Sequence, residues 1–313
     1  MARDIERLGL RMDNKVSIIV PTYNGSKFLL NMLKNVSRQT YSNYELIVVI
    51  DASTDNSFQL IRNNSRMDSR VRIVKNEVNL GASACRNVGI DQSSGSYLAF
   101  LDHDDLWHPE KLRKQISFLQ KNESVVGVLS NYVVCRDSGF GVKAIGAFRF
   151  KNMERLYRRW LHIQGDGPLL PSTLVMRSIE NAPRFNEELS AVYDIEFLGQ
   201  LMKLGEVKNL DEFLTAYMQH DNQMHRDPRS ILEIANLSSI SLQEKRTLSR
   251  KSRVYSRLLM NSTVSLNPLN ARLFIGDYWI ALNILVGVLV RRLKRKVIKW
   301  WSIRKINALI EAI

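Results

Sequence analysis

Short apolar runs alternate with segments of helical periodicity through the first 120 residues. Strands are predicted over 16–20, 45–50, 71–74 and 97–101, with helices over 26–38, from 56 to 61 and from 79 to 89. The strand-like runs are apolar throughout, which is typical of strands buried on both faces. The β-α-β-α-β-α-β order therefore predicts an α/β fold in which a mainly parallel sheet is flanked by helices.

The pattern is less regular after residue 108. The expected elements are a helix over 109–119, strands over 125–134 and 169–176, a Gly-rich loop over 136–150, a basic helix over 152–162, and helices over 189–204 and 229–260. This pattern predicts one domain over 1–228, a helical extension over 229–270 and a tail over 271–313.

Polar residues follow three of the predicted strands at the point where each strand ends. Thr22-Tyr23-Asn24 follows the first strand, Asp51 follows the second, and Asp102, Asp104 and Asp105 follow the fourth. In open parallel sheets the ligand lies at the carboxyl ends of the strands. We therefore expect these clusters to meet at one edge and to form a binding site.

Placing the carboxylates of Asp102, Asp104 and Asp105 beside a buried strand costs free energy unless a positive charge lies near them. Oxygen ligands suit Mg²⁺ or Mn²⁺ holding a phosphate-bearing substrate. The alternative is a turn whose carboxylates are solvated. Cys85 and Cys135 form no metal-ligand pattern and fit a reducing compartment, and the polar residues 1–15 contain no signal-peptide core.

Net charge is concentrated at the end of the chain. The whole chain carries +14, and residues 251–313 contain twelve Lys or Arg against two acids. Residues 273–290 are apolar apart from Asp277 and Asn283, and a segment of apolar, Trp and basic residues follows. We expect 271–313 to associate with an anionic membrane surface, lying on it or spanning it. A core helix followed by a solvated basic helix is the alternative, and the absence of a recognition motif argues against nucleic acid.

Four runs in the first 120 residues resemble family 2 glycosyltransferases. They are Val16-Ser-Ile-Ile-Val-Pro-Thr-Tyr-Asn24, Gln39 to Asp55, Arg86-Asn-Val-Gly89 and Leu101-Asp-His-Asp-Asp-Leu-Trp-His-Pro-Glu-Lys-Leu112. Weaker similarity continues through Pro171 to Met176, Arg184 to Leu189, Asp194 and Tyr217 to His220. The resemblance implies a GT-A fold, a nucleotide-sugar donor (usually a UDP-sugar), a divalent metal (Mn²⁺ or Mg²⁺) and inversion at the anomeric carbon.

The resemblance also implies roles for individual residues. Asp194 would be the catalytic base, and Asp104, Asp102 and His220 would hold the metal. The nucleotide-sugar would be bound by Pro21, Thr22, Tyr23, Asn24, Asp51, Arg86 and Asp102. An ordinary helix Asp at 194 and a structural His at 220 remain as alternatives.

The chain departs from the family pattern at four positions. Ile50 replaces the first Asp of a pair and should point into the core, and Ala52 replaces the following Gly. Tyr193 replaces the Glu before the base, and Gln200 stands near a position that often carries Arg. The assignment of Asp194 as the base is the one that these departures weaken most.

Together these observations predict an inverting glycosyltransferase of surface polysaccharide synthesis, such as O-antigen or capsule. Its acceptor would be a lipid-linked or growing glycan, and it would lie on the cytoplasmic face of the inner (cell) membrane as a peripheral or monotopic protein. The alternatives are transfer to a protein or simple membrane lipid, and a catalytically silent binding subunit. The sequence specifies neither the sugar nor the linkage, and it leaves an oligomer open.

Overall fold

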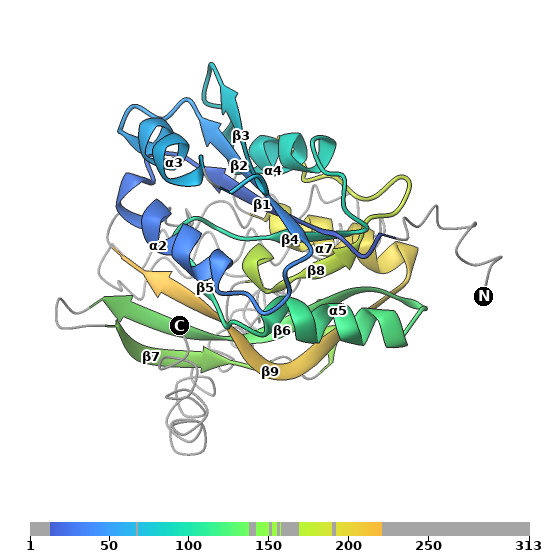
Figure 1. Ribbon diagram of the computed structural model, residues 1–313. Coiled ribbons are helices and arrows are strands. Elements are labelled where there is room, and N and C mark those ends of the chain that lie inside the picture. Colours follow the sequence, from blue (N-terminus) through green and yellow to red (C-terminus); the bar gives the residue numbers. More distant parts are fainter. Residues whose placement is uncertain are drawn as a thin grey trace, which may run out of the picture.

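The computed structural model describes residues 13–220 except 67, 138–141, 150–151, 155–156, 158–168 and 190–191. Within these residues a nine-stranded sheet has the order β3-β2-β1-β4-β8-β6-β9-β5, and β7 pairs with β6 outside that path. Helices lie on both faces of the sheet (Figure 1). The α/β prediction is confirmed.

The first half of the sheet is parallel. It contains β1 (Val16–Thr22), β2 (Tyr44–Asp51), β3 (Val71–Asn76) and β4 (Tyr97–Phe100), connected by helices α2 (Ser26–Ser37), α3 (Ser57–Ser65) and α4 (Gly81–Asp91). Every residue of β1, β2 and β4 is buried, as the continuous apolar runs predict. This half therefore follows the sequence closely.

The second half of the sheet is mixed. Its strands are β5 (Leu106–Trp107), β6 (Val125–Asp137), β7 (Val142–Phe148), β8 (Val175–Arg177) and β9 (Glu206–Gln219), with helices α5 (Lys111–Lys121), η1 (Pro171–Thr173) and α7 (Tyr193–Leu204). The pair β6–β9 is parallel, whereas β8 runs antiparallel to both β4 and β6. It follows that β6 and β9 run in the same direction as β4.

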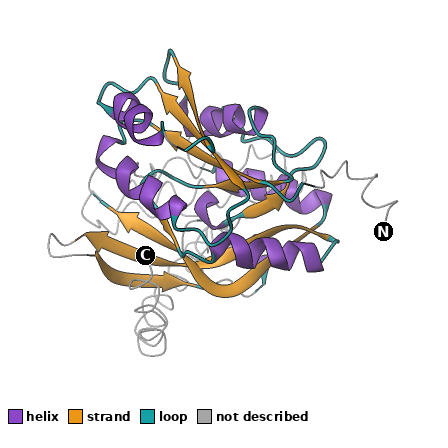
Figure 2. Cartoon of the chain, viewed as in Figure 1, coloured by secondary structure: helices purple, strands orange, loops and turns teal. Residues whose placement is uncertain are grey.

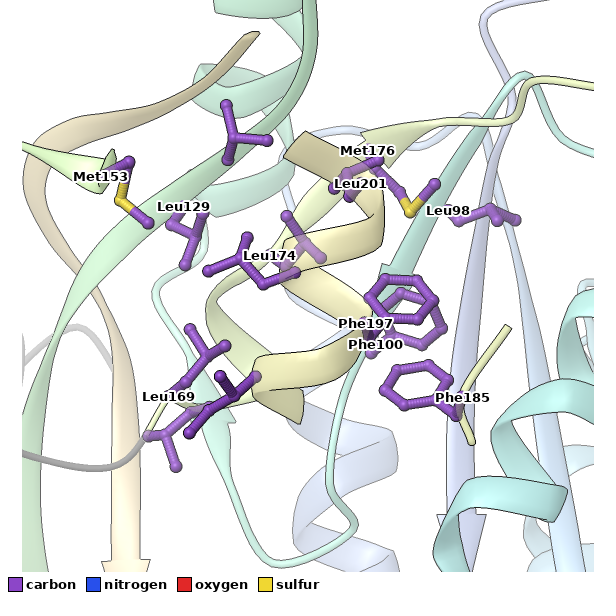
Figure 3. Close-up of a cluster of buried hydrophobic side chains, with 14 of the residues drawn as sticks. Leu98, Phe100, Leu129, Met153, Leu169, Leu174, Met176, Phe185, Phe197 and Leu201 are labelled. Carbon is purple, nitrogen blue, oxygen red and sulfur yellow. The ribbon is translucent and has the colours of Figure 1, made fainter. Parts of the chain in front are cut away.

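Helices lie on both faces of the sheet strands (Figure 2), and the two largest apolar cores lie beneath them on opposite faces. Ile18 and Val20 of β1 belong to the core beneath α2, α3 and α5, and Ile19 belongs to the core beneath α4 and α7. This split follows from the two-residue period of a strand. The α7 core contains Phe100, Phe185 and Phe197, whose rings lie together beside that helix (Figure 3).

Three sequence expectations need correction. The loop expected over 136–150 contains β7. This strand contains Gly and Ala and has only a weak apolar pattern, and it is stabilised by antiparallel pairing with β6. The strand expected over 169–176 begins later, because Pro171 opens a 3₁₀ turn before β8. The helix expected from 189 starts at Tyr193, and β9, a charged and half-buried strand, was not predicted at all.

Several predictions fall on residues beyond this description. Most of the basic helix at 152–162, the extension at 229–270 and the tail at 271–313 lie outside the described residues. Among the helices that are described, none combines the length and the apolar composition needed to cross a membrane.

Candidate nucleotide-sugar site

The polar strand ends meet at one edge of the sheet. Strands β2, β1 and β4 are parallel neighbours, so Asp51 and Thr22, which end β2 and β1, lie on the same side of the sheet as the residues after Phe100. Strand β9 runs in the same direction, and His220 follows its last residue. The sheet topology alone therefore assembles the predicted clusters, as expected for an open α/β sheet.

Asp51 accepts hydrogen bonds from the first turn of α4. Its Oδ1 accepts from the backbone N–H of Leu80 and from Nδ2 of Asn76, both at 2.9 Å, and its Oδ2 accepts from the N–H of Gly81 at 2.8 Å. These bonds satisfy donors that a helix start leaves unpaired. The preceding Ile50 is 1% exposed within the core, as predicted. Contact with the nucleotide-sugar stays a prediction for Asp51.

The loop after β1 and the loop after β2 are joined by side-chain hydrogen bonds. Oδ1 of Asn24 accepts from the backbone N–H of Thr54 at 2.9 Å. Asn24 and Ala52 both have left-handed backbones, with φ of 48° and 49°. Tyr23 is 48% exposed beside them, which leaves its ring available to a ligand. Oγ1 of Thr22 is buried and has no hydrogen-bond partner among the described residues.

Asp104 lies against His220. Nε2 of His220 is 2.9 Å from Oδ2 of Asp104, and the ring of Phe28 packs on the imidazole with 4.6 Å between ring centres. Asp105 is different, because it is 1% exposed and its Oδ1 accepts from the N–H of Met218 at 3.2 Å. Burial, followed by the charges of Asp104 and Asp102, raises the pKa of Asp105 well above its usual range. This agrees with a structural role for Asp105.

The Asp104–His220 pair fits a divalent metal of the Mn²⁺ or Mg²⁺ type. The carboxylate suits either ion, and the imidazole nitrogen favours Mn²⁺ over the harder Mg²⁺. Nδ1 of His220 is buried without a hydrogen-bond partner in the described part of the chain, so the ring is not committed to another acceptor. No group of three or more metal-ligating side chains is assembled among the described residues. Of the three predicted ligands, Asp104 and His220 are in contact with each other, whereas Asp102 is paired with Arg86.

Asp102 is paired with Arg86. Nη2 of Arg86 donates to Oδ1 of Asp102 at 2.5 Å, and the two side chains are 2% and 28% exposed. Burial alone would lower the pKa of Arg86, but the Asp102 carboxylate outweighs burial and holds it above the usual range. Arg86 thus lies beneath Asp102, away from solvent. Direct contact between Arg86 and the nucleotide-sugar stays a prediction, and the burial of Arg86 does not favour it.

Asp194 lies in the first turn of α7 and is 4% exposed. It lines a small crevice together with apolar side chains that include Leu129, Pro171 and Phe197. The preceding Tyr193 is within cation–π distance of Arg86, 5.3 Å from ring centre to guanidinium carbon. The candidate base is therefore next in sequence to a residue that contacts the Arg86–Asp102 pair, and its catalytic role stays a prediction.

Other features of the site had no clear sequence signal. Val78 and Leu80 are 63% and 48% exposed in the loop that carries the N–H group bonded to Asp51. Phe185 contacts Arg86, although only the weak similarity over 184–189 indicated that this segment belongs to the site. Such contacts depend on how distant segments pack, which a local pattern does not encode.

Comparisons with known proteins agree with this architecture. A model of the family described as "Glycosyl transferase family 2" matches residues 17–180. An uncharacterised glycosyltransferase of Haemophilus influenzae is 30% identical over 217 residues, which are 66% of this chain and 66% of that protein. The Escherichia coli protein named UDP-Glc:alpha-D-GlcNAc-diphosphoundecaprenol beta-1,3-glucosyltransferase WfgD is 38% identical over 127 residues, which are 40% of this chain and 49% of that protein. The matched regions thus span about half to two thirds of these relatives.

The fold has solved counterparts. The structure of S. aureus TarS 1–349 in complex with UDP-GlcNAc matches with a TM-score of 0.57 and 20% identity, over 86% of this chain and 79% of that one. At this identity the likeness concerns the fold, which agrees with the GT-A architecture expected from the sequence.

Proposed function

Because this chain belongs to glycosyl transferase family 2, we propose that it transfers a sugar from a UDP-sugar to a hydroxyl of a lipid-linked or growing glycan, with inversion at the anomeric carbon. The observation that carries the proposal is the convergence of Asp51, Asp102 and the Asp104–His220 pair at one sheet edge. WfgD, whose name specifies a UDP-sugar donor and a diphosphoundecaprenol acceptor, supports the choice of substrate classes.

Each part of the site has a task in this reaction. Tyr23 and Asp51 bind and orient the nucleoside, and Thr22 contributes a hydroxyl that has no hydrogen-bond partner among the described residues. Asp104 and His220 would hold a divalent metal, which when bound supplies positive charge against the leaving diphosphate. Asp194 takes the proton from the acceptor hydroxyl as that oxygen attacks the anomeric carbon. A single base and a direct displacement give inversion.

We propose further that residues 271–313 attach the enzyme to the cytoplasmic face of the cell membrane. The apolar run at 273–290 and the six Lys or Arg residues between 291 and 299 support this. A membrane-bound enzyme would meet a lipid-linked acceptor at the surface where that acceptor resides.

The proposal is tested by adding nucleotide sugars to the full chain with Mn²⁺. We expect one UDP-sugar to raise the melting temperature, because a ligand that binds only the folded state stabilises it. UDP should then be released from that donor faster when a polyprenyl-diphosphate-linked glycan is added. The product's NMR spectrum should show that the transferred sugar has the anomeric configuration opposite to that in the donor. A chain that responds to no nucleotide sugar would contradict the proposal.

Two alternatives give different results in the same assay. A catalytically silent binding subunit would be stabilised by the donor without releasing UDP in the presence of any acceptor. A transferase acting on a protein or a simple membrane lipid would release UDP with those acceptors and not with the polyprenyl-linked glycan.

A further inference from the structure

The guanidinium group of Arg86 contacts both Asp102 and the helix that carries Asp194. Arg86 donates to Asp102, one of the residues that converge at the proposed donor site. The guanidinium carbon of Arg86 also lies 5.3 Å from the ring centres of Phe185 and Tyr193. Tyr193 is the first residue of α7 and precedes Asp194. The carboxylate at the donor and the helix that carries the candidate base are therefore in contact with the same side chain.

The aromatic rings interact with N–H groups of Arg86 that would otherwise be buried without a partner. Nε and Nη1 of Arg86 are buried and have no hydrogen-bond partner among the described residues. Buried N–H groups are rarely left unpaired, and an aromatic face can attract a cation or an N–H. Since the Arg86 side chain is only 2% exposed, it has little surface to offer a substrate. Any effect of Arg86 on the reaction is therefore transmitted through its neighbours.

Phe185 is held firmly in this arrangement. The side chain of Asn87 donates to the carbonyl of Phe185 at 2.8 Å and accepts from its N–H at 2.9 Å. The Phe185 ring also stacks on Phe197 of α7, with 4.1 Å between ring centres and 11° between the ring planes (Figure 3). Helix α7 is thus attached to Arg86 at Tyr193 directly and, one turn later, at Phe197 through Phe185.

We propose that Arg86 is a positioning residue that couples the Asp102 carboxylate to helix α7, with the Phe185 and Tyr193 rings as the connection. The inference rests on the proposed function, in which Asp102 borders the donor and Asp194 is the base. In this arrangement the Tyr193 ring stabilises the Arg86 guanidinium. The Glu that the family usually has at this position would instead place a second carboxylate near Asp102. The contact between Tyr193 and Arg86 therefore fixes the start of α7 and so positions Asp194.

The test is a double-mutant cycle on the full-length enzyme. Tyr193→Leu removes the ring and should lower kcat by about tenfold or more while donor KM changes by less than about threefold, because the donor contacts stay in place. Tyr193→Phe keeps the ring but loses the hydroxyl, which also interacts with Arg86, so it should retain more activity than Tyr193→Leu. Arg86→Met combined with Tyr193→Leu should be no slower than Arg86→Met alone, because both changes break one connection.

The matched control is an equivalent contact outside the site. The guanidinium of Arg70 pairs with Asp68 at 2.8 Å and lies 4.3 Å from the ring centre of Tyr44. Tyr44→Leu should therefore lower stability and leave kcat unchanged. A kcat for Tyr193→Leu equal to that of Tyr44→Leu would overturn the coupling, and so would additive losses in the cycle.

A second variant covers the case in which Tyr193→Leu does not fold. Arg86→Lys keeps the positive charge beside Asp102 but loses the planar group that stacks between the rings. Its kcat should fall by about tenfold with little change in donor KM, and a wild-type kcat would overturn the inference. A wild-type chain that turns over no nucleotide sugar would instead overturn the proposed function on which the inference rests.

Discussion

Nε2 of His220 lies 2.9 Å from Oδ2 of Asp104, although the two residues are 116 positions apart in the chain. The contact joins the end of β9 to the loop after β4, and Phe28 of α2 packs on the imidazole. It brings a second potential metal ligand to the carboxylate cluster. The position of β9 in the sheet is therefore part of the architecture of the site.

Changing His220 should weaken metal binding more than it affects the fold. His220→Asn should lower Mn²⁺ affinity in the presence of UDP by about 10- to 100-fold, and Asp104→Ala should remove it, because each loses a ligand. Calorimetric titration of Mn²⁺ measures both. His108→Asn is the control, since His108 lies near Lys114, Glu110 and Glu212, outside the Asp104–His220 pair. Wild-type Mn²⁺ affinity in both site variants would refute the metal assignment.

Changing Asp194 should affect the chemical step alone. Asp194→Asn should lower kcat for transfer by about 10²- to 10⁴-fold, because an amide cannot remove the proton from the hydroxyl of the acceptor glycan. Donor affinity, measured by titration with UDP-sugar, should stay near the wild-type value. The comparison variant is Glu196→Gln, which changes a second buried acid of α7. A larger loss of kcat in Glu196→Gln than in Asp194→Asn would move the base to Glu196.

The parallel half of the fold could be predicted because its signals are local. The apolar runs that form β1, β2 and β4 are continuous, and the polar residues at their ends mark the edge where a ligand binds. The burial of Ile50 followed from the same pattern. Local sequence and global fold agree in this half, so the carboxyl ends of the strands could be assigned without coordinates.

The rest of the site could not be predicted from local patterns. Strand β9 is charged and half-buried, so its sequence lacks the alternation that marks a strand, and its pairing with β6 and β5 defines it. The aromatic neighbours of Arg86 come from segments about 100 residues away. Contacts of this kind follow from tertiary packing, which overrides local propensity.

Replacing Ala52 should stabilise the protein. Ala52 has φ of 49°, a left-handed backbone that is unfavourable for a residue with a Cβ atom. Ala52→Gly should raise the free energy of unfolding by about 0.5 kcal/mol, because relief of this strain exceeds the entropy that glycine adds to the unfolded chain. Urea denaturation measures the change. Ala84→Gly inside α4 should instead be destabilising by about 1 kcal/mol, and a loss in both variants would argue against strain at Ala52.

The tail should bind anionic membranes. The full chain is expected to float with vesicles that contain phosphatidylglycerol, and a chain lacking residues 271–313 should remain in the soluble fraction. Replacing the six Lys or Arg residues between 291 and 299 by Gln keeps the length and should weaken binding mainly to the anionic vesicles. A full-length chain that floats with neither anionic nor neutral vesicles would contradict the membrane assignment.

Stability at acidic pH should depend on Glu45, at the opposite end of β2 from Asp51. Burial of Glu45 opposes ionisation, but hydrogen bonds from Ser17 and Ser94 outweigh it and lower its pKa to about 2 from 4.5. The carboxylate therefore stabilises the fold fully above pH 4.5, and this contribution, about 2 kcal/mol, is lost as the pH falls toward 2. The difference in unfolding free energy between wild type and Glu45→Gln should shrink over that range. Glu77→Gln, which affects an exposed pair with Lys75, should show no such change.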